Sequence, residues 1–168
     1  MTSINSKKEA AVAEINIGIQ AEKRSVVVKR LTRLLADEQV LYTKLRNYHW
    51  NVQGMFFQSL HAFFEEQYTA LFTVTDDIAE RIRSLGEFSI GSLISFLDNA
   101  RLGESNHLNG DASAMLKQIL DDHESIIRML RDDINVTQEL GDEGTTDFLI
   151  GLMQTHEKMA WMVRSHLG

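Results

Sequence analysis

Proline is absent from all 168 residues of this chain, and only 10 residues are glycine. Proline breaks helices and glycine weakens them, so a chain with so few of either favours long α-helices. In four segments the apolar residues recur at three- and four-residue steps, which is the period of a helix with one buried face. The sequence therefore predicts an all-α fold.

The four periodic segments cover residues 24–52, 58–85, 111–140 and 145–167. The few residues between the first two allow only an antiparallel hairpin. The connection between the second and third is long, and residues 92–99 predict a short extra helix within it. A four-helix bundle whose middle connection crosses over is the ferritin-like arrangement. Residues 23–168 are expected to form this domain, after a flexible N-terminal tail over residues 1–22.

Composition excludes several kinds of site. The chain has no cysteine, which excludes disulfides, thiolate metal sites and a cysteine nucleophile. No apolar run approaches the roughly 18 residues that a membrane-spanning helix needs. The formal net charge of −7 opposes simple electrostatic attraction to nucleic acid. These features favour a cytoplasmic protein without a membrane partner.

Four side chains of the second predicted helix are suitable metal ligands. Counting 100° per residue from His61 places Glu65 at about 40°, Asp76 at about 60° and Glu80 at about 100° around the helix axis. The apolar stripe is centred elsewhere, near 290° by the same count. Imidazole and carboxylate together suit Fe(II), and carboxylates hold Fe(III). The stripe therefore predicts an iron site, for which zinc is the competing metal.

The four ligands form two pairs that one helix cannot bring together. His61 with Glu65 and Asp76 with Glu80 are each four residues apart, close enough to share an ion. Between Glu65 and Asp76, however, the helix rises by roughly 16 Å. The pairs are symmetric about the midpoint between residues 70 and 71. Two copies packed antiparallel across a two-fold axis would form two identical sites, each completed by His49 from the first helix.

A plainer interpretation explains each part separately. A histidine and a glutamate four residues apart usually form a solvated ion pair, and Asp76 and Glu80 have Arg81 and Arg83 as nearby partners. His49 beside Trp50 is also compatible with an ordinary cluster at the end of a hairpin. The shared stripe and the matched spacing favour the metal interpretation.

Three stretches together resemble the Dps family, the DNA-binding proteins from starved cells. They are residues 47–54 (NYHWNVQG), 57–68 (FQSLHAFFEEQY) and 76–86 (DDIAERIRSLG), and residues 156–162 (HEKMAWM) in the fourth helix are also similar. The resemblance implies a shell of twelve copies with two-fold and three-fold interfaces. It also implies a ferroxidase that oxidises Fe(II), preferably with hydrogen peroxide, and stores ferric mineral in the shell, protecting against oxidative damage.

The same resemblance assigns roles to individual residues. His49, His61 and Glu65 would come from one chain, and Asp76 and Glu80 from its partner, around one iron or two. Many members have aspartate where this chain has Glu65. Trp50 matches a tryptophan near the iron site, where it would handle electrons or serve only in packing. The acidic start of the fourth helix would line a three-fold pore for iron entry, through Asp142, Glu143 and Asp147.

Two other functions compete with iron storage. One is a nucleoid-associated, DNA-protecting protein with secondary iron chemistry, but Lys7 and Lys8 are the only basic residues before Lys23. DNA binding is therefore expected to be weak and salt-sensitive, or absent. The other is a di-iron oxygenase or reductase, which would need paired Glu-x2-His motifs inside one bundle. Histidines 123 and 156 fall on or beside apolar stripes and are expected to be core or interface residues.

Overall fold

The computed structural model describes residues 15–104 and 108–168. Five helices account for most of these residues, in agreement with the predicted ferritin-like bundle and its extra short helix. Their bounds are α1 Ala21–Asn51, α2 Phe57–Ser84, α3 Leu93–Asn99, α4 Ala112–Glu139 and α5 Glu143–Leu167. No helix in the described part of the chain is both long and apolar enough to cross a membrane.

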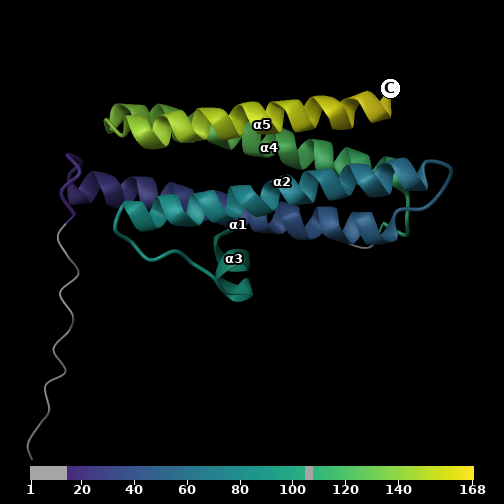
Figure 1. Ribbon diagram of the computed structural model, residues 1–168, viewed down its shortest axis with the longest axis horizontal. Coiled ribbons are helices and arrows are strands. Elements are labelled where there is room, and N and C mark those ends of the chain that lie inside the picture. The colour runs from purple at the N-terminus through teal and green to yellow at the C-terminus, as the bar shows by residue number, and fades with distance from the viewer. Residues whose placement is uncertain (1–14, 105–107) are drawn as a thin grey trace, which may run out of the picture.

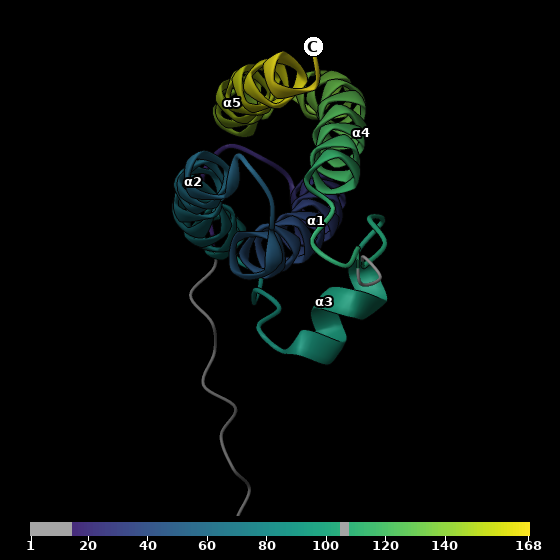
Figure 2. The ribbon, with the colours of Figure 1, turned by 90° about the vertical axis from the view of Figure 1, so that its right-hand side faces the viewer.

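The four long helices run side by side as two antiparallel pairs. Figure 1 shows α1 beside α2 and α4 beside α5, and the end-on view in Figure 2 shows all four helices around a common centre. The short α3 lies outside the bundle, next to α1. Because α1 and α2 form a hairpin, the end of α1 and the beginning of α2 are neighbours in space. Most of the candidate ligands are found there.

Side-chain caps set the beginning of three helices. Ser92, Asp111 and Asp142 each accept a hydrogen bond from the backbone N–H three residues later, at the first turn of α3, α4 and α5. At the other end of α2, Gly86 has a φ of 99°, the left-handed conformation that commonly ends a helix. The residue before the first turn thus marks the start of α3, α4 and α5, and Gly86 marks the end of α2.

The core fills the centre of the bundle with aliphatic and aromatic side chains from all four long helices. Its largest fully buried members are Tyr48, Phe64, Leu31, Leu34, Leu41, Leu45, Leu71, Ile78, Ile82, Leu85, Met115 and Ile119. The apolar stripes predicted for the first two helices are buried here, except that Tyr42 and Tyr68 are only half-buried. Tyr68 lies on the side of α2 that carries Glu65.

Ionic contacts hold the long middle connection against the bundle. The buried carboxylate of Asp37 on α1 accepts hydrogen bonds from the backbone and the guanidinium of Arg101 and from the backbone N–H of Leu102. A second buried ion pair joins Lys44 Nζ to Asp122 Oδ2 at 2.6 Å, which ties α1 to α4. A buried charge needs such a partner, so these contacts fix where α3 and α4 pack on α1.

Candidate metal centre

His49 and His61 lie against each other where the α1–α2 hairpin turns. Their imidazole rings are stacked, with centroids 3.7 Å apart and planes inclined by 20°. Each ring donates a hydrogen bond to the other residue's backbone: Nδ1 of His49 lies 2.7 Å from the carbonyl oxygen of His61, and Nδ1 of His61 lies 2.8 Å from that of His49. The two hydrogen bonds are reciprocal and hold both rings in place.

These hydrogen bonds fix the tautomer of both histidines. A carbonyl oxygen can only accept, so the Nδ1 atom of each neutral ring must carry the hydrogen. The Nε2 atom of each ring then has a free lone pair, which is the form in which imidazole binds a metal. A backbone carbonyl that orients a ligating histidine in this way is a common feature of metal sites.

Two aromatic side chains of α2 enclose the histidine pair. Phe57 is stacked on His61, with ring centroids 5.2 Å apart and planes inclined by 30°. Tyr68 meets His49 edge to face, at 5.4 Å and 81°. The order of rings is therefore Phe57, His61, His49 and Tyr68. Sequence reasoning did not assign Phe57 or Tyr68 to the site.

Glu65 lies one turn after His61 on α2, with an exposed side chain. Its Oε1 atom accepts a hydrogen bond of 3.3 Å from the hydroxyl of Tyr68. Within the described residues, 15–104 and 108–168, no three histidine, aspartate or glutamate side chains are arranged to hold a metal ion. One chain thus contributes two oriented imidazoles and a nearby carboxylate, which is an incomplete ligand set.

Asp76 and Glu80 lie farther along α2, and both are exposed. In the described part of the chain neither carboxylate has an ion-pair partner. The arginines that the plainer interpretation paired with them are engaged elsewhere. Arg81 donates to Asp142 and Thr145, and Arg83 donates to the carbonyl of Glu87. The two carboxylates are therefore available to another chain.

Trp50 follows His49 at the end of α1, with 62% of its surface exposed. The guanidinium of Arg46 lies over its ring, 4.9 Å from the centroid, a cation–π contact. The indole lies on the surface and not among the core side chains. A role for Trp50 beside the metal stays a prediction.

The three acidic residues predicted for a pore differ in their environment. Asp142 is buried, caps α5 and forms an ion pair with Arg81 at 2.8 Å. The positive charge of Arg81 therefore balances the carboxylate of Asp142 within the chain. Glu143 and Asp147 are exposed on the first turns of α5. The pore role of Asp142, Glu143 and Asp147 stays a prediction.

His123 and His156 are completely buried at the centre of the bundle, one of the two positions expected for them. Their Nδ1 atoms lie 3.0 Å apart, and Nε2 of His123 lies 3.0 Å from Oε1 of Gln67. Nε2 of His156 lies 2.8 Å from Oε1 of the equally buried Glu38. Each of the four long helices contributes one residue to this chain of contacts, which we call the central polar chain. Glu38 and Gln67 were not anticipated, although each interrupts an apolar stripe.

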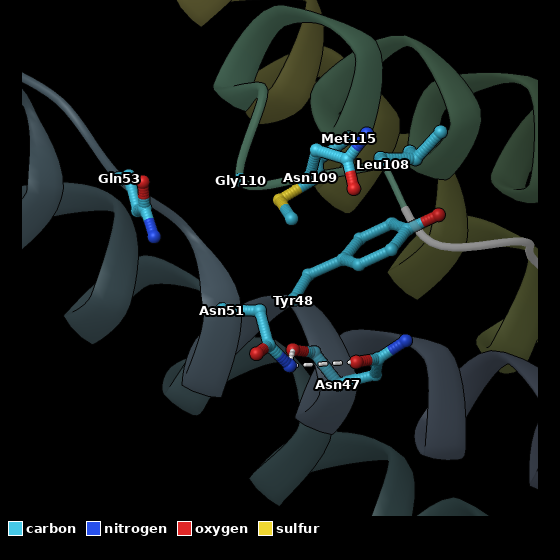
Figure 3. Close-up of a pocket in the computed structure, with 8 residues that line it drawn as sticks. All are labelled: Asn47, Tyr48, Asn51, Gln53, Leu108, Asn109, Gly110 and Met115. Atoms are coloured by element: carbon cyan, nitrogen blue, oxygen red, sulfur yellow. Dashed lines mark hydrogen bonds between the residues drawn. The ribbon is translucent and has the colours of Figure 1, made fainter.

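A separate polar pocket of about 370 Å³ opens between the end of α1 and the start of α4 (Figure 3). Carboxamides dominate its lining, and Asn51 donates a hydrogen bond of 2.8 Å to Asn47 within it. None of the candidate metal ligands is among its lining residues. The pocket is distinct from the histidine pair.

Comparison with known proteins places this architecture in one family. The family model for the ferritin-like domain matches residues 28–168. DNA protection during starvation protein 2 of Bacillus anthracis is 37% identical over 84% of this chain and 97% of its own length. A low temperature-induced protein of Nostoc sp. is 45% identical over 91% of this chain and 86% of its own.

A solved structure agrees with these sequence matches. It is the Dps protein from Vibrio cholerae, described as a member of a broad superfamily of ferritin-like diiron-carboxylate proteins. That protein is 33% identical and superposes with a TM-score of 0.89, over 95% of this chain and 100% of the other. The fold, the family model and the relatives agree, and the chain belongs to the Dps family of ferritin-like proteins.

Proposed function

We propose that this protein oxidises Fe(II), preferably with hydrogen peroxide, at a site shared by two copies of the chain, and stores the ferric product inside a shell of twelve copies. The observation that carries the proposal is the pair of reciprocal hydrogen bonds between His49 and His61. They orient two imidazoles with free Nε2 atoms beside the carboxylate of Glu65, and nitrogen and oxygen donors of this kind suit iron.

Iron is the substrate, and the protein contributes geometry and charge. Two Fe(II) ions supply two electrons to one hydrogen peroxide molecule, which takes up two protons and gives two water molecules. Two-electron reduction avoids release of hydroxyl radical. The ligands keep the reactants together and stabilise Fe(III) with carboxylate charge, so no side chain has to act as a nucleophile.

The second half of each site is assigned to the partner chain. Asp76 and Glu80 are exposed and unpaired among the described residues, and they mirror Glu65 and His61 about the middle of α2. Phe72, between the two ligand pairs, leaves 65% of its surface exposed. Packing two α2 helices antiparallel would cover this ring and bring each ligand pair to its counterpart.

Other exposed surfaces support a larger assembly. Leu93, Ile94 and Leu97 of α3 are each more than half exposed, as is Trp161 on α5. Large apolar side chains grouped on a surface mark protein–protein contacts. The shell of twelve that the family resemblance implies would cover them. In that shell, Glu143 and Asp147 would line the three-fold pores, where acidic side chains attract cations.

Stopped-flow oxidation of anaerobic Fe(II), with peroxide and separately with oxygen, tests the proposal. The double variant His61→Ala with Glu65→Ala removes two of the three ligands from one chain. We expect the fast phase of oxidation to fall by at least tenfold in the variant. Glu66→Ala, a neighbouring exposed carboxylate on α2, is the control and should retain the wild-type rate.

Equal rates for the wild type and the double variant would refute the site assignment. Light scattering on the same samples tests the assembly. A particle of about 19 kDa, the mass of one chain, would contradict both the shell and the shared site.

A further inference from the structure

Tyr68 contacts two of the three candidate ligands on its own chain. Its hydroxyl donates to Oε1 of Glu65 at 3.3 Å, and its ring edge meets the imidazole of His49 at a centroid distance of 5.4 Å. Glu65 and Tyr68 are three residues apart on α2, so the two side chains lie on the same side of the helix. Nothing in the ligand pattern itself requires a tyrosine at this position.

The Tyr68 ring is itself held in place. It packs edge to face against Tyr42 of α1, with centroids 6.0 Å apart and planes at 88°. His49 packs against the same ring, and the reciprocal hydrogen bonds fix His49 in turn. A tyrosine has only two rotatable side-chain bonds, so these contacts leave its hydroxyl in a nearly fixed position.

Glu65 needs such a contact more than an aspartate would. Its side chain is exposed and has one more rotatable bond than aspartate. Ordering a free glutamate side chain costs rotamer entropy. A hydrogen bond from a fixed donor lowers that cost before the metal arrives, because part of the order already exists.

The hydroxyl of Tyr68 is a donor at neutral pH. A phenol carries its proton at neutral pH, because its ordinary pKa is about 10. The phenol thus keeps its proton and can donate to the carboxylate. The other oxygen of Glu65 is left for the metal.

We propose that Tyr68 is a positioning residue of the iron site, holding the Glu65 carboxylate beside the imidazoles of His49 and His61. This inference rests on the proposed function and deepens it. It explains how a chain with glutamate at this position, longer by one methylene than aspartate, presents the carboxylate to the same metal. Hydrogen-bond partners of ligating carboxylates are typically worth 10- to 100-fold in metal affinity.

The test uses the assembled full-length protein, with Tyr68→Phe to remove only the hydroxyl. Co(II) serves as the probe, because its visible absorption reports both affinity and coordination without turnover. We expect the apparent Co(II) affinity to fall about tenfold and the absorption spectrum to change. In Fe(II) oxidation the KM should rise by a similar factor while kcat stays within about twofold.

Tyr42→Phe is the matched control. It removes a phenol from the same aromatic group, but this phenol contacts Arg46 and not Glu65. We expect wild-type Co(II) affinity and oxidation from this variant. In a Glu65→Ala background, Tyr68→Phe should have no additional effect, because the tyrosine acts through that carboxylate.

The possible results distinguish failure of the positioning role of Tyr68 from failure of the iron site. If the wild type binds Co(II) and oxidises Fe(II), while Tyr68→Phe matches it in affinity, spectrum and KM, the positioning role is overturned and the iron site stands. If Tyr68→Phe weakens binding equally with and without Glu65, the tyrosine does not act through Glu65, and the inference is likewise overturned. If the wild type neither binds Co(II) nor oxidises Fe(II), the proposed function fails first, and the inference fails with it.

Discussion

Donors and acceptors in the central polar chain determine where its protons lie. The Oε1 atom of Gln67 accepts from Nε2 of His123, so Nδ1 of a neutral His123 has a lone pair. Nδ1 of His156, 3.0 Å away, must then be the donor of that contact. Nε2 of His156 lies 2.8 Å from Oε1 of Glu38 at the other end of the chain of contacts. If His123 took up a second proton, its Nδ1–H would face the Nδ1–H of His156, and two donors would meet without an acceptor.

Acid should therefore weaken the fold through His123. Burial, together with the charge of His156, holds the pKa of His123 well below its usual value of 6.5. In the unfolded chain this histidine titrates near 6.5, so the unfolded state takes up the proton first as the pH falls. The contribution of His123 to stability is thus complete above about pH 6.5 and decreases below it, by up to about 1.4 kcal/mol per pH unit.

The variant His123→Gln tests this expectation, because glutamine does not titrate. Urea unfolding at pH 7.5 and pH 5.0, at one protein concentration, should show a smaller loss of unfolding free energy for the variant than for the wild type. His166→Gln, which replaces an exposed histidine, should keep the wild-type pH dependence. An identical loss in His123→Gln and the wild type would show that His123 is not the acid-sensitive group.

At the scale of elements, the beginning of α5 depends on one carboxylate. Asp142 Oδ1 accepts from the backbone N–H of Thr145, Oδ2 accepts from the Thr145 hydroxyl, and Arg81 of α2 donates to Oδ1. The cap therefore also joins α5 to the far end of α2. Because the guanidinium is partly exposed, its ion pair adds less than a fully buried one would.

Removing that carboxylate should destabilise the protein without altering the metal ligands. We expect Asp142→Ala to lower the free energy of unfolding by about 2 kcal/mol, from loss of the cap and of the contact with Arg81. Glu143→Ala, at the next and exposed position, should stay within about 0.5 kcal/mol of the wild type. Urea midpoints measure both. Equal midpoints for the two variants would contradict a capping role for Asp142.

The helices could be predicted because their sequence signals are local. Periodicity and the absence of proline located all five helices, and every helix end agrees with the prediction within three residues. The start of α5 was placed at residue 145, whereas the helix begins at Glu143. The apolar pattern begins later than the helix, and the actual boundary depends on the side chain of Asp142.

The part of the site whose residues are spaced regularly along one helix could be predicted from the sequence. The contacts between residues of different helices could not. Helical spacing identified the stripe from His61 to Glu80, the end of the first helix offered His49, and the resemblance assigned His49 its role. The contact of His49 with the carbonyl of His61, and of Tyr68 with the ring of His49, depends on the packing of α1 against α2. The ion pair that Asp142 forms with Arg81 was likewise not predictable, because the two residues are 61 positions apart in sequence.

At the scale of the whole molecule, one chain alone cannot form the proposed metal site. Each copy supplies its histidines and Glu65 to one site and its Asp76 and Glu80 to another. A two-fold axis makes the two sites of a pair equivalent, so loss of either ligand group from every chain removes both sites. A protein that lacks the histidine half and a protein that lacks the carboxylate half are therefore both inactive. The two kinds of variant can complement each other only when both are present in one assembly.

Mixing two inactive variants should therefore restore activity. One variant carries His61→Ala with Glu65→Ala, and the other carries Asp76→Ala with Glu80→Ala. In a mixed pair, one site receives both intact halves and the other receives both damaged halves. Random reassembly from equal amounts gives mixed pairs half of the time, so about a quarter of all sites should be intact.

The measurement is the peroxide-driven oxidation rate after the two variants are unfolded together and refolded into the assembled form. We expect about a quarter of the wild-type rate, although each variant refolded alone is inactive. Variants refolded separately and mixed afterwards are the control, since their pairs have already formed. If joint refolding restores no activity while light scattering shows normal assemblies, the ligands do not come from two chains. The half-site at His49 and His61 would then have to be completed within one chain.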